Sequence, residues 1–121
     1  MTGELGTAFA RAVAEKDDAR VLELLHPEVD FRGMTPGRVW EATGPGDVLT
    51  ALHFWFDEHD LIEDIDAIES DSFADRQRVG YRLRVRNNDG LYLVEQQAYL
   101  SERDGRISWL RIMCSGFRSI E

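Results

Sequence analysis

The stretch VGYRLRVRNNDGLYLVEQQAYLSERDGRISWLRIMCSGF, residues 79–117, decides the fold. It contains three strand-like runs that are separated by two turns, Asp89-Gly90 and Asp104-Gly105. Such turns favour hairpins because glycine adopts the positive φ that a tight reversal requires. The sequence therefore predicts an antiparallel meander of three strands in the C-terminal half of the chain.

The length of the first loop decides which side chains share a face of this meander. A three-residue loop pairs Leu83 with Glu95. A two-residue loop shifts the pairing by one residue and sets Glu95 opposite Arg84 or Arg82 as an exposed ion pair. We prefer the three-residue loop. Its inner face consists of Val79, Tyr81, Leu83, Val85, Leu93, Glu95, Gln97 and Tyr99.

The N-terminal part of the chain is predicted to be helical. Residues 5–13 carry apolar side chains at the i, i+4, i+8 spacing of one helix face. A second short helix begins at Asp17 or Asp18 as its N-cap and ends at His26-Pro27, and a third begins within residues 44–47. We expect an α+β fold in which N-terminal helices pack in the concavity of a strongly curved, mainly antiparallel sheet.

Glu28–Phe31 and Arg38–Ala42 are expected to be short extended segments.

Charge is unevenly distributed between residues 57 and 86. From Asp57 to Asp75 the chain is acidic and has no arginine or lysine, and from Arg76 to Arg86 the balance reverses. If these two segments are neighbouring strands, cross-strand ion pairs of about 0.2–1 kcal/mol each fix their pairing. The alternative is two solvated faces that merely avoid self-repulsion.

Composition limits the classes of function. A chain of 121 residues fits a single domain, residues 1–121. Its net charge of −9 argues against a nucleic-acid partner and against an anionic membrane surface. No apolar run approaches the ~20 residues that span a bilayer, and the first residues do not resemble a signal peptide. We therefore expect a cytoplasmic protein.

Metal and cofactor sites are not expected. Cys114 is the only cysteine, which excludes a disulfide within the chain and a cysteine-based zinc site. His26, His53 and His59 do not occur at a spacing typical of metal ligands. No phosphate-binding glycine pattern is present, so we predict neither a metal nor a cofactor.

Three parts of the chain together resemble a known family. The end of the helix pair, LLHPEVDF (Leu24–Phe31), the third helix, and the close of the meander, GRISWLR (Gly105–Arg111), resemble the nuclear transport factor 2-like superfamily and its SnoaL-like branch. The resemblance implies a cone-shaped α+β barrel whose helices and bent sheet leave an apolar cavity. Members include isomerases, dehydratases, polyketide cyclases, epoxide hydrolases and binding proteins, so the fold does not define a function.

Ketosteroid isomerase is the best-understood member of this superfamily, and its catalytic groups are missing from this sequence. Alignment places Phe9 at the oxyanion-hole tyrosine, Gly33 at the aspartate base and Gln97 at the protonated aspartate. The resemblance therefore implies that steroid isomerase activity is absent. In SnoaL-like cyclases a pocket acid is the base, and Glu95 is the nearest candidate.

Glu95 interrupts the apolar run from Leu91 to Val94. If it faces the cavity unpaired, its pKa rises and it can act as a general acid or base. If it pairs with an arginine, its role is structural. The residues expected to line the cavity and contact a ligand are Trp40, Tyr81, Gln97 and Tyr99.

Two functions remain open, and whether the protein is an enzyme stays undecided at this stage. The first is a binding protein for a small apolar molecule. The second is a SnoaL-like isomerase, cyclase or dehydratase that acts on an apolar or polycyclic ketone. We also expect a homodimer, as the resemblance implies, through an outer sheet face that presents Tyr92, Val94, Gln96, Ala98 and Leu100. The second hairpin fits a two-residue or a three-residue loop, and in one of these two registers Trp109 and Met113 join that face.

Overall fold

The computed structural model describes residues 4–120. Its helices are α1 (Glu4–Ala14), α2 (Asp18–Leu24) and α3 (Pro45–Trp55). Its strands are β1 (Leu25–Thr35), β2 (Arg38–Thr43), β3 (Leu61–Phe73), β4 (Arg76–Asn87), β5 (Gly90–Arg103), β6 (Arg106–Cys114) and β7 (Arg118–Ser119). No helix in this described range is long and apolar enough to cross a membrane.

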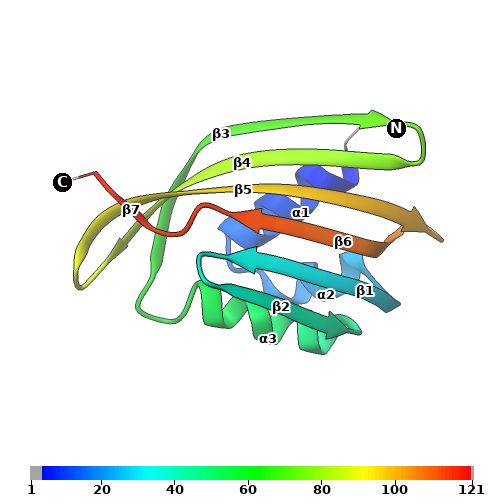
Figure 1. Ribbon diagram of the computed structural model, residues 1–121, viewed down its shortest axis with the longest axis horizontal. Helices are drawn as coiled ribbons and strands as arrows, with labels where there is room; N and C mark the ends of the chain where they lie inside the picture. Colours follow the sequence, from blue (N-terminus) through cyan, green and yellow to red (C-terminus); the bar gives the residue numbers. More distant parts are fainter. Residues whose placement is uncertain (1–3, 121) are drawn as a thin grey trace.

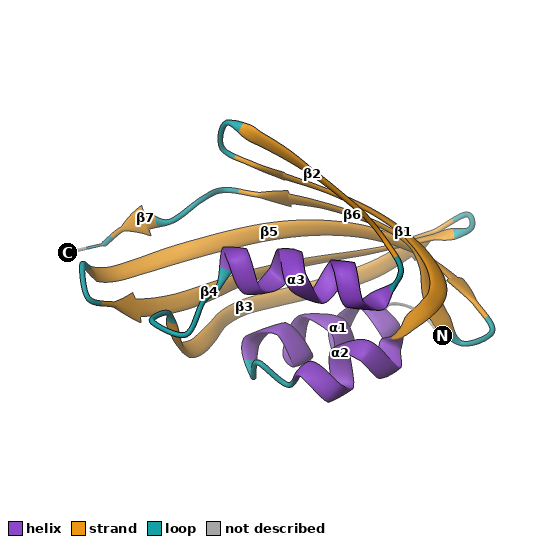
Figure 2. Ribbon diagram, turned by 90° about the horizontal axis from the view of Figure 1, so that it is seen from below, coloured by secondary structure: helices purple, strands orange, loops and turns teal. Residues whose placement is uncertain are grey.

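The strands form one mixed, mostly antiparallel sheet in the order β2-β1-β6-β5-β4-β3, and β7 pairs with β5 (Figure 1). β1 and β6 are parallel, whereas the other pairs are antiparallel. All three helices lie on the same side of the bent sheet (Figure 2). This arrangement confirms the predicted α+β fold, because the apolar helix faces and the inner sheet face bury one another.

Local sequence explains where the helices begin. The Asp17 carboxylate accepts a hydrogen bond from the Arg20 amide at 3.1 Å and caps α2. Gly44 has φ +90°, and Pro45 follows it in the first turn of α3. The end of α2 and the length of β1 differ from the prediction. β1 starts directly at Leu25, so that His26-Pro27 already belongs to the strand.

The three-residue loop predicted between β4 and β5 is wrong. Asn87 is opposite Gly90, which leaves a two-residue loop of Asn88 and Asp89. The pairing is therefore the alternative one, in which Arg82 lies opposite Glu95. Every side chain of β5 is on the face opposite to the one that we preferred.

Burial explains this pairing. The inner positions of β5 are now Val94, Gln96, Ala98 and Leu100, each 0% exposed. The other pairing would turn the Glu95 carboxylate inward. Burying an unpaired charge costs far more free energy than burying an amide, and the Gln96 amide has a hydrogen-bond donor in Tyr81. Apolar burial and charge exclusion thus favour the same register.

The acidic and basic segments are neighbouring strands, so of the two alternatives the structure selects cross-strand ion pairs over two separately solvated faces. Across β3 and β4, nitrogen and oxygen atoms of the charged groups are 2.7–3.1 Å apart. The pairs are Arg78–Asp71, Arg84–Asp66 and Arg86–Glu63. Their positions near solvent limit each to about 0–1 kcal/mol, so they specify pairing more than they stabilise the fold.

The outer face of the sheet differs from the predicted one. The β5 residues that were expected on this face lie on the inner face instead: Tyr92, Val94, Gln96, Ala98 and Leu100. Trp109 and Met113 do lie on the outer side, since β6 pairs them with Ser101 and Gln97. The homodimer itself stays a prediction, with a different set of contact residues.

Candidate functional site

Glu95 does not face the interior. Its Oε1 atom accepts a hydrogen bond from Arg82 Nη2 at 2.7 Å, and the two side chains are 45% and 48% exposed. The catalytic hypothesis required an unpaired carboxylate inside the cone. The predicted placement is wrong, because the two-residue loop turns this position outward. We therefore do not retain Glu95 as the acid or base of a reaction.

Gln97 and Tyr99 share this outer face, so their expected place in an internal cavity is also wrong. Gln97 lies over Gly80 and accepts a hydrogen bond from Arg78 Nη1 at 3.1 Å. Tyr99 is 39% exposed and packs edge-on against Phe73, with ring centroids 6.3 Å apart. Both residues belong to the surface of the sheet.

Tyr81 points inward as predicted and belongs to a buried polar cluster. Its hydroxyl donates to Gln96 Oε1 at 2.6 Å. Burial raises the pKa of the Tyr81 phenol far above its usual value of about 10. Gln96 Nε2 and Trp55 Nε1 are buried donors that have no hydrogen-bond partner within residues 4–120. A ligand contact for Tyr81 stays a prediction.

Trp40 lies at the edge of the helical face and is half-buried. Its Nε1 donates to Thr35 Oγ1 at 2.8 Å, and the Arg38 guanidinium lies 3.5 Å from its ring centroid. Its ring meets Trp55 edge-on and Phe54 at a tilt. These contacts account for its orientation, and a ligand contact for Trp40 also stays a prediction.

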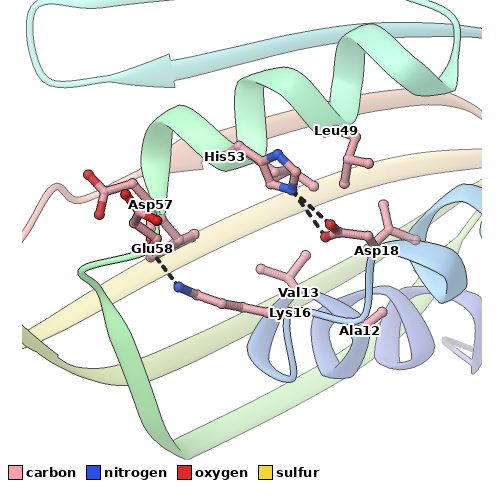
Figure 3. A pocket seen from close by; sticks show the side chains of 11 residues that line it. Ala12, Val13, Lys16, Asp18, Leu49, His53, Asp57 and Glu58 are labelled. Atoms are coloured by element: carbon pink, nitrogen blue, oxygen red, sulfur yellow. Dashed lines mark hydrogen bonds and ion pairs between the residues drawn. The ribbon is translucent and has the colours of Figure 1, made fainter.

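A groove between α3 and the α1–α2 pair has a volume of about 520 Å³ (Figure 3). Apolar side chains form its floor, and charged groups stand along its rim. Its lining residues are Ala12, Val13, Lys16, Asp18, Val21, Leu49, Leu52, His53, Phe56, Asp57 and Glu58. The helix groove, as we call this set, combines an apolar surface with titratable groups.

A histidine and an aspartate face one another across the helix groove. His53 on α3 has its Nε2 atom 3.1 Å from both carboxylate oxygens of Asp18 on α2 (Figure 3). Both side chains are about half exposed. A neutral imidazole that donates from Nε2 keeps Nδ1 as an acceptor, and within the described residues Nδ1 has no partner. The pair can therefore accept a proton from a bound molecule.

Lys16 fixes the opposite end of the rim. Its Nζ atom donates to the backbone oxygens of Asp57, at 2.6 Å, and Asp60. The Asp60 side chain is buried and accepts from the Asp57 amide at 3.1 Å and from Asn87 Nδ2 at 3.0 Å. These bonds join the α1–α2 turn to the loop that follows α3, so the ends of the helix groove are held in place.

The helix groove is a site that is not predicted from the sequence, in which His53 stands only as a histidine without a metal-ligand partner. Leu49, Leu52, His53 and Phe56 follow the i, i+3, i+4, i+7 spacing of one helix face, and that spacing was the available signal. The partner of His53 lies 35 residues away, and no local pattern identifies it. No group of three or more His, Cys, Asp or Glu side chains within residues 4–120 is arranged to hold a metal ion.

Comparison with known proteins identifies the fold. No family model and no curated protein matches the sequence. Solved structures do match the fold. A protein of Catenulispora acidiphila with a ketosteroid isomerase-like fold, in complex with trimethylamine, has a TM-score of 0.70 at 15% identity, covering 95% of this chain and 88% of its own.

Two further structures agree. An epoxide hydrolase of Mycobacterium tuberculosis, of the LEH-like type, has a TM-score of 0.67 at 16% identity over 92% of this chain and 80% of its own. An NTF2-like protein of Burkholderia xenovorans has a TM-score of 0.66 at 12% identity over 93% of this chain and 87% of its own. The chain therefore has the nuclear transport factor 2-like fold.

Proposed function

We propose that this protein binds a small molecule whose apolar body lies in the helix groove and whose polar group meets the rim. The observation that carries the proposal is the groove itself. It has a volume of about 520 Å³, its floor is apolar, and the His53–Asp18 pair and Lys16 lie at its rim. Small-molecule sites commonly have about 300–1,000 Å³, a mainly apolar lining and a few polar groups that orient the ligand.

The groove is also preformed, which favours binding. Lys16 and Asp60 hold its end through backbone contacts, as described above. Floor residues such as Val13, Leu52 and Phe56 belong to the buried core, so packing beneath the groove fixes their positions. A rigid site loses little conformational entropy when a ligand binds.

A second candidate function is an acid/base enzyme, an isomerase, cyclase or dehydratase that acts on an apolar or polycyclic ketone. The His53–Asp18 pair favours it. Asp18 orients the ring through Nε2, and Nδ1 is the atom that would take a proton from the carbon next to the carbonyl group. His53 replaces Glu95 as the candidate base.

The binding proposal is tested with hexanol as a neutral apolar probe, by following backbone amide chemical shifts in NMR titrations. We expect the shifts to map to the lining of the helix groove. Leu49→Trp fills the groove from α3 and prevents the ligand from burying its apolar surface there. We expect the affinity for hexanol to fall about tenfold or more, since a tenfold change corresponds to only about 1.4 kcal/mol of lost apolar burial. Shifts confined to other parts of the molecule would contradict the proposal.

Leu22→Trp is the matched control. It introduces the same side chain on a helix, at a position on α2 that is 40% exposed and does not line the groove. We expect its affinity for hexanol to equal that of the parent protein. Equal loss in both variants would show that the effect of Leu49→Trp is not specific to the groove.

The enzyme candidate has its own test. Tetralone in deuterated buffer should exchange its acidic carbon-bound hydrogens faster with the protein than without it. His53→Gln should remove this acceleration and leave hexanol binding intact. His59→Gln is the control, because His59 is exposed beside Glu58 and lies outside the groove lining. Exchange that survives in His53→Gln rules out His53 as the base.

A further inference from the structure

At one side of the helix groove, the polar atoms that still lack hydrogen-bond partners are acceptors. Asp18 presents two oxygens that share a single donor, His53 Nε2. An ionised carboxylate offers about four lone-pair sites, so several remain open. His53 Nδ1 is a further open acceptor in the neutral ring. A ligand group that fits here must supply several hydrogens.

The charge of the lining is negative. It contains three carboxylates, Asp18, Asp57 and Glu58, and one ammonium group, Lys16. With His53 neutral, one positive and three negative charges leave a net charge of −2. The whole chain carries −9. This field attracts cations and repels anions.

The one cation of the lining is already engaged. Lys16 directs its Nζ hydrogens to the backbone oxygens of Asp57 and Asp60. Its ammonium group is therefore hydrogen-bonded to the loop after α3. The two oxygens of the Asp18 carboxylate, in contrast, share one donor, the N–H group of His53 Nε2. The less satisfied charge in the groove is the negative one.

The floor restricts the rest of the ligand. Val13 and Leu49 point into the space between the helices from opposite sides (Figure 3). Val21, Leu52 and Phe56 complete a surface without polar side-chain atoms. A ligand body that is alkyl or aryl gains free energy of about 25 cal/mol for each Å² that it buries there.

We infer that the helix groove selects small amines with an apolar body, which donate from a protonated nitrogen to the open lone pairs of the Asp18 carboxylate. This inference rests on the proposed binding function and names its ligand class. An ammonium group supplies three donors, and its bonds to a carboxylate are charge-assisted and stronger than neutral ones. A carboxylate ligand of the same shape would place its charge against Asp18.

Three probes of equal chain length test the inference: hexylamine, hexanol and hexanoate, titrated by NMR at neutral pH and low salt. We expect hexylamine to bind about tenfold more tightly than hexanol, as one charge-assisted hydrogen bond allows, and hexanoate to bind more weakly than hexanol. Added salt should reduce the preference, since the rim is open to solvent.

Asp18→Asn should lower the affinity for hexylamine much more than that for hexanol, so that the two affinities become nearly equal. Glu23→Gln is the matched control. It removes the same charge from an exposed position of α2 that pairs with Arg20 outside the groove, and it should keep the preference for the amine. Circular dichroism of both variants checks that the fold is intact.

The outcomes separate the two proposals. If hexanol fails to bind, the proposed function is wrong and the ligand class falls with it. If hexanol binds but hexylamine binds no more tightly than hexanol, the binding function is retained and the preference for amines is overturned. The same holds if hexanoate binds more tightly than hexanol because it reaches Lys16. A preference for the amine that persists in Asp18→Asn also overturns it.

Discussion

The Tyr81 hydroxyl donates to Gln96 Oε1 at 2.6 Å across β4 and β5, and both side chains are buried on the inner face of the sheet. This bond satisfies one atom of each residue. Gln96 Nε2 has no partner among the described residues, and the same is true of Trp55 Nε1 on α3. Removal of the partner of a buried polar group typically costs about 1–3 kcal/mol.

A double-mutant cycle on this pair should be strongly non-additive. Gln96→Leu removes the acceptor and leaves the Tyr81 hydroxyl unpaired, and Tyr81→Phe leaves Gln96 Oε1 unpaired. We expect Tyr81→Phe to lower the free energy of unfolding by about 1–3 kcal/mol and Gln96→Leu to lower it less, because Gln96→Leu also removes the unpaired Nε2 group. The double variant should lose less than the sum, because it leaves neither member of the pair without a partner. Urea denaturation measures all three variants, and strict additivity would contradict the pairing.

Stability should fall at alkaline pH because of Tyr81. Burial raises the pKa of its phenol, so the folded protein keeps the proton when the unfolded chain begins to lose it near pH 10. The contribution is full below that pH and is lost as the pH rises further, by about 1.4 kcal/mol per pH unit.

The variant Tyr81→Phe isolates this effect. Its unfolding free energy between about pH 9 and pH 11 should depend less on pH than that of the parent protein. Tyr99→Phe, at a position that is 39% exposed, is the control and should keep the full slope. An unchanged slope in Tyr81→Phe would contradict the assignment to Tyr81.

Replacement of Glu95 by glutamine should have little effect. The carboxylate and its partner Arg82 are both about half exposed, and such ion pairs contribute about 0–1 kcal/mol. We expect a decrease in unfolding free energy of this size in urea denaturation, with hexanol binding unchanged. A loss of several kcal/mol would indicate that the carboxylate is buried, contrary to the observed register.

How far the sequence predicts this molecule depends on the range of the interaction. Apolar periodicity, caps and turn residues are local, and they correctly predicted the third helix and the order of the helices and the meander, whereas the charge pattern left the pairing of the acidic and basic segments open. The Asp104-Gly105 reversal is one such local feature, because both residues have positive φ, 56° and 78°, as a tight turn requires. Its length of two residues follows from the pairing of Arg103 with Arg106 and was left open by the sequence.

The first hairpin shows where local information ends. Its Asp-Gly sequence fits two loop lengths, and the choice between them depends on total burial along β5, where Glu95 and Gln96 compete for the interior. The helix groove depends on tertiary packing in the same way. Its histidine and aspartate are far apart in sequence, and only the packing of α3 beside α2 brings them together.

The exposed apolar residues of the outer sheet face suggest where a second copy would bind. Met34 lies opposite Val39 on β2 and opposite Met113 on β6, and the three side chains are 50–61% exposed. They form an apolar strip across three neighbouring strands. Such a strip favours association, since burying it removes apolar area from water.

We therefore expect a homodimer through this strip. Sedimentation at micromolar concentration should give the mass of two chains. Met113→Asp introduces a charge into the strip and should give the mass of one chain, because an unpaired carboxylate in an apolar interface costs several kcal/mol. Leu22→Asp makes a similar change on α2, at a position that is 40% exposed, and should stay dimeric. A monomer mass for the parent protein would refute the expectation, and a dimeric Met113→Asp would place the interface elsewhere.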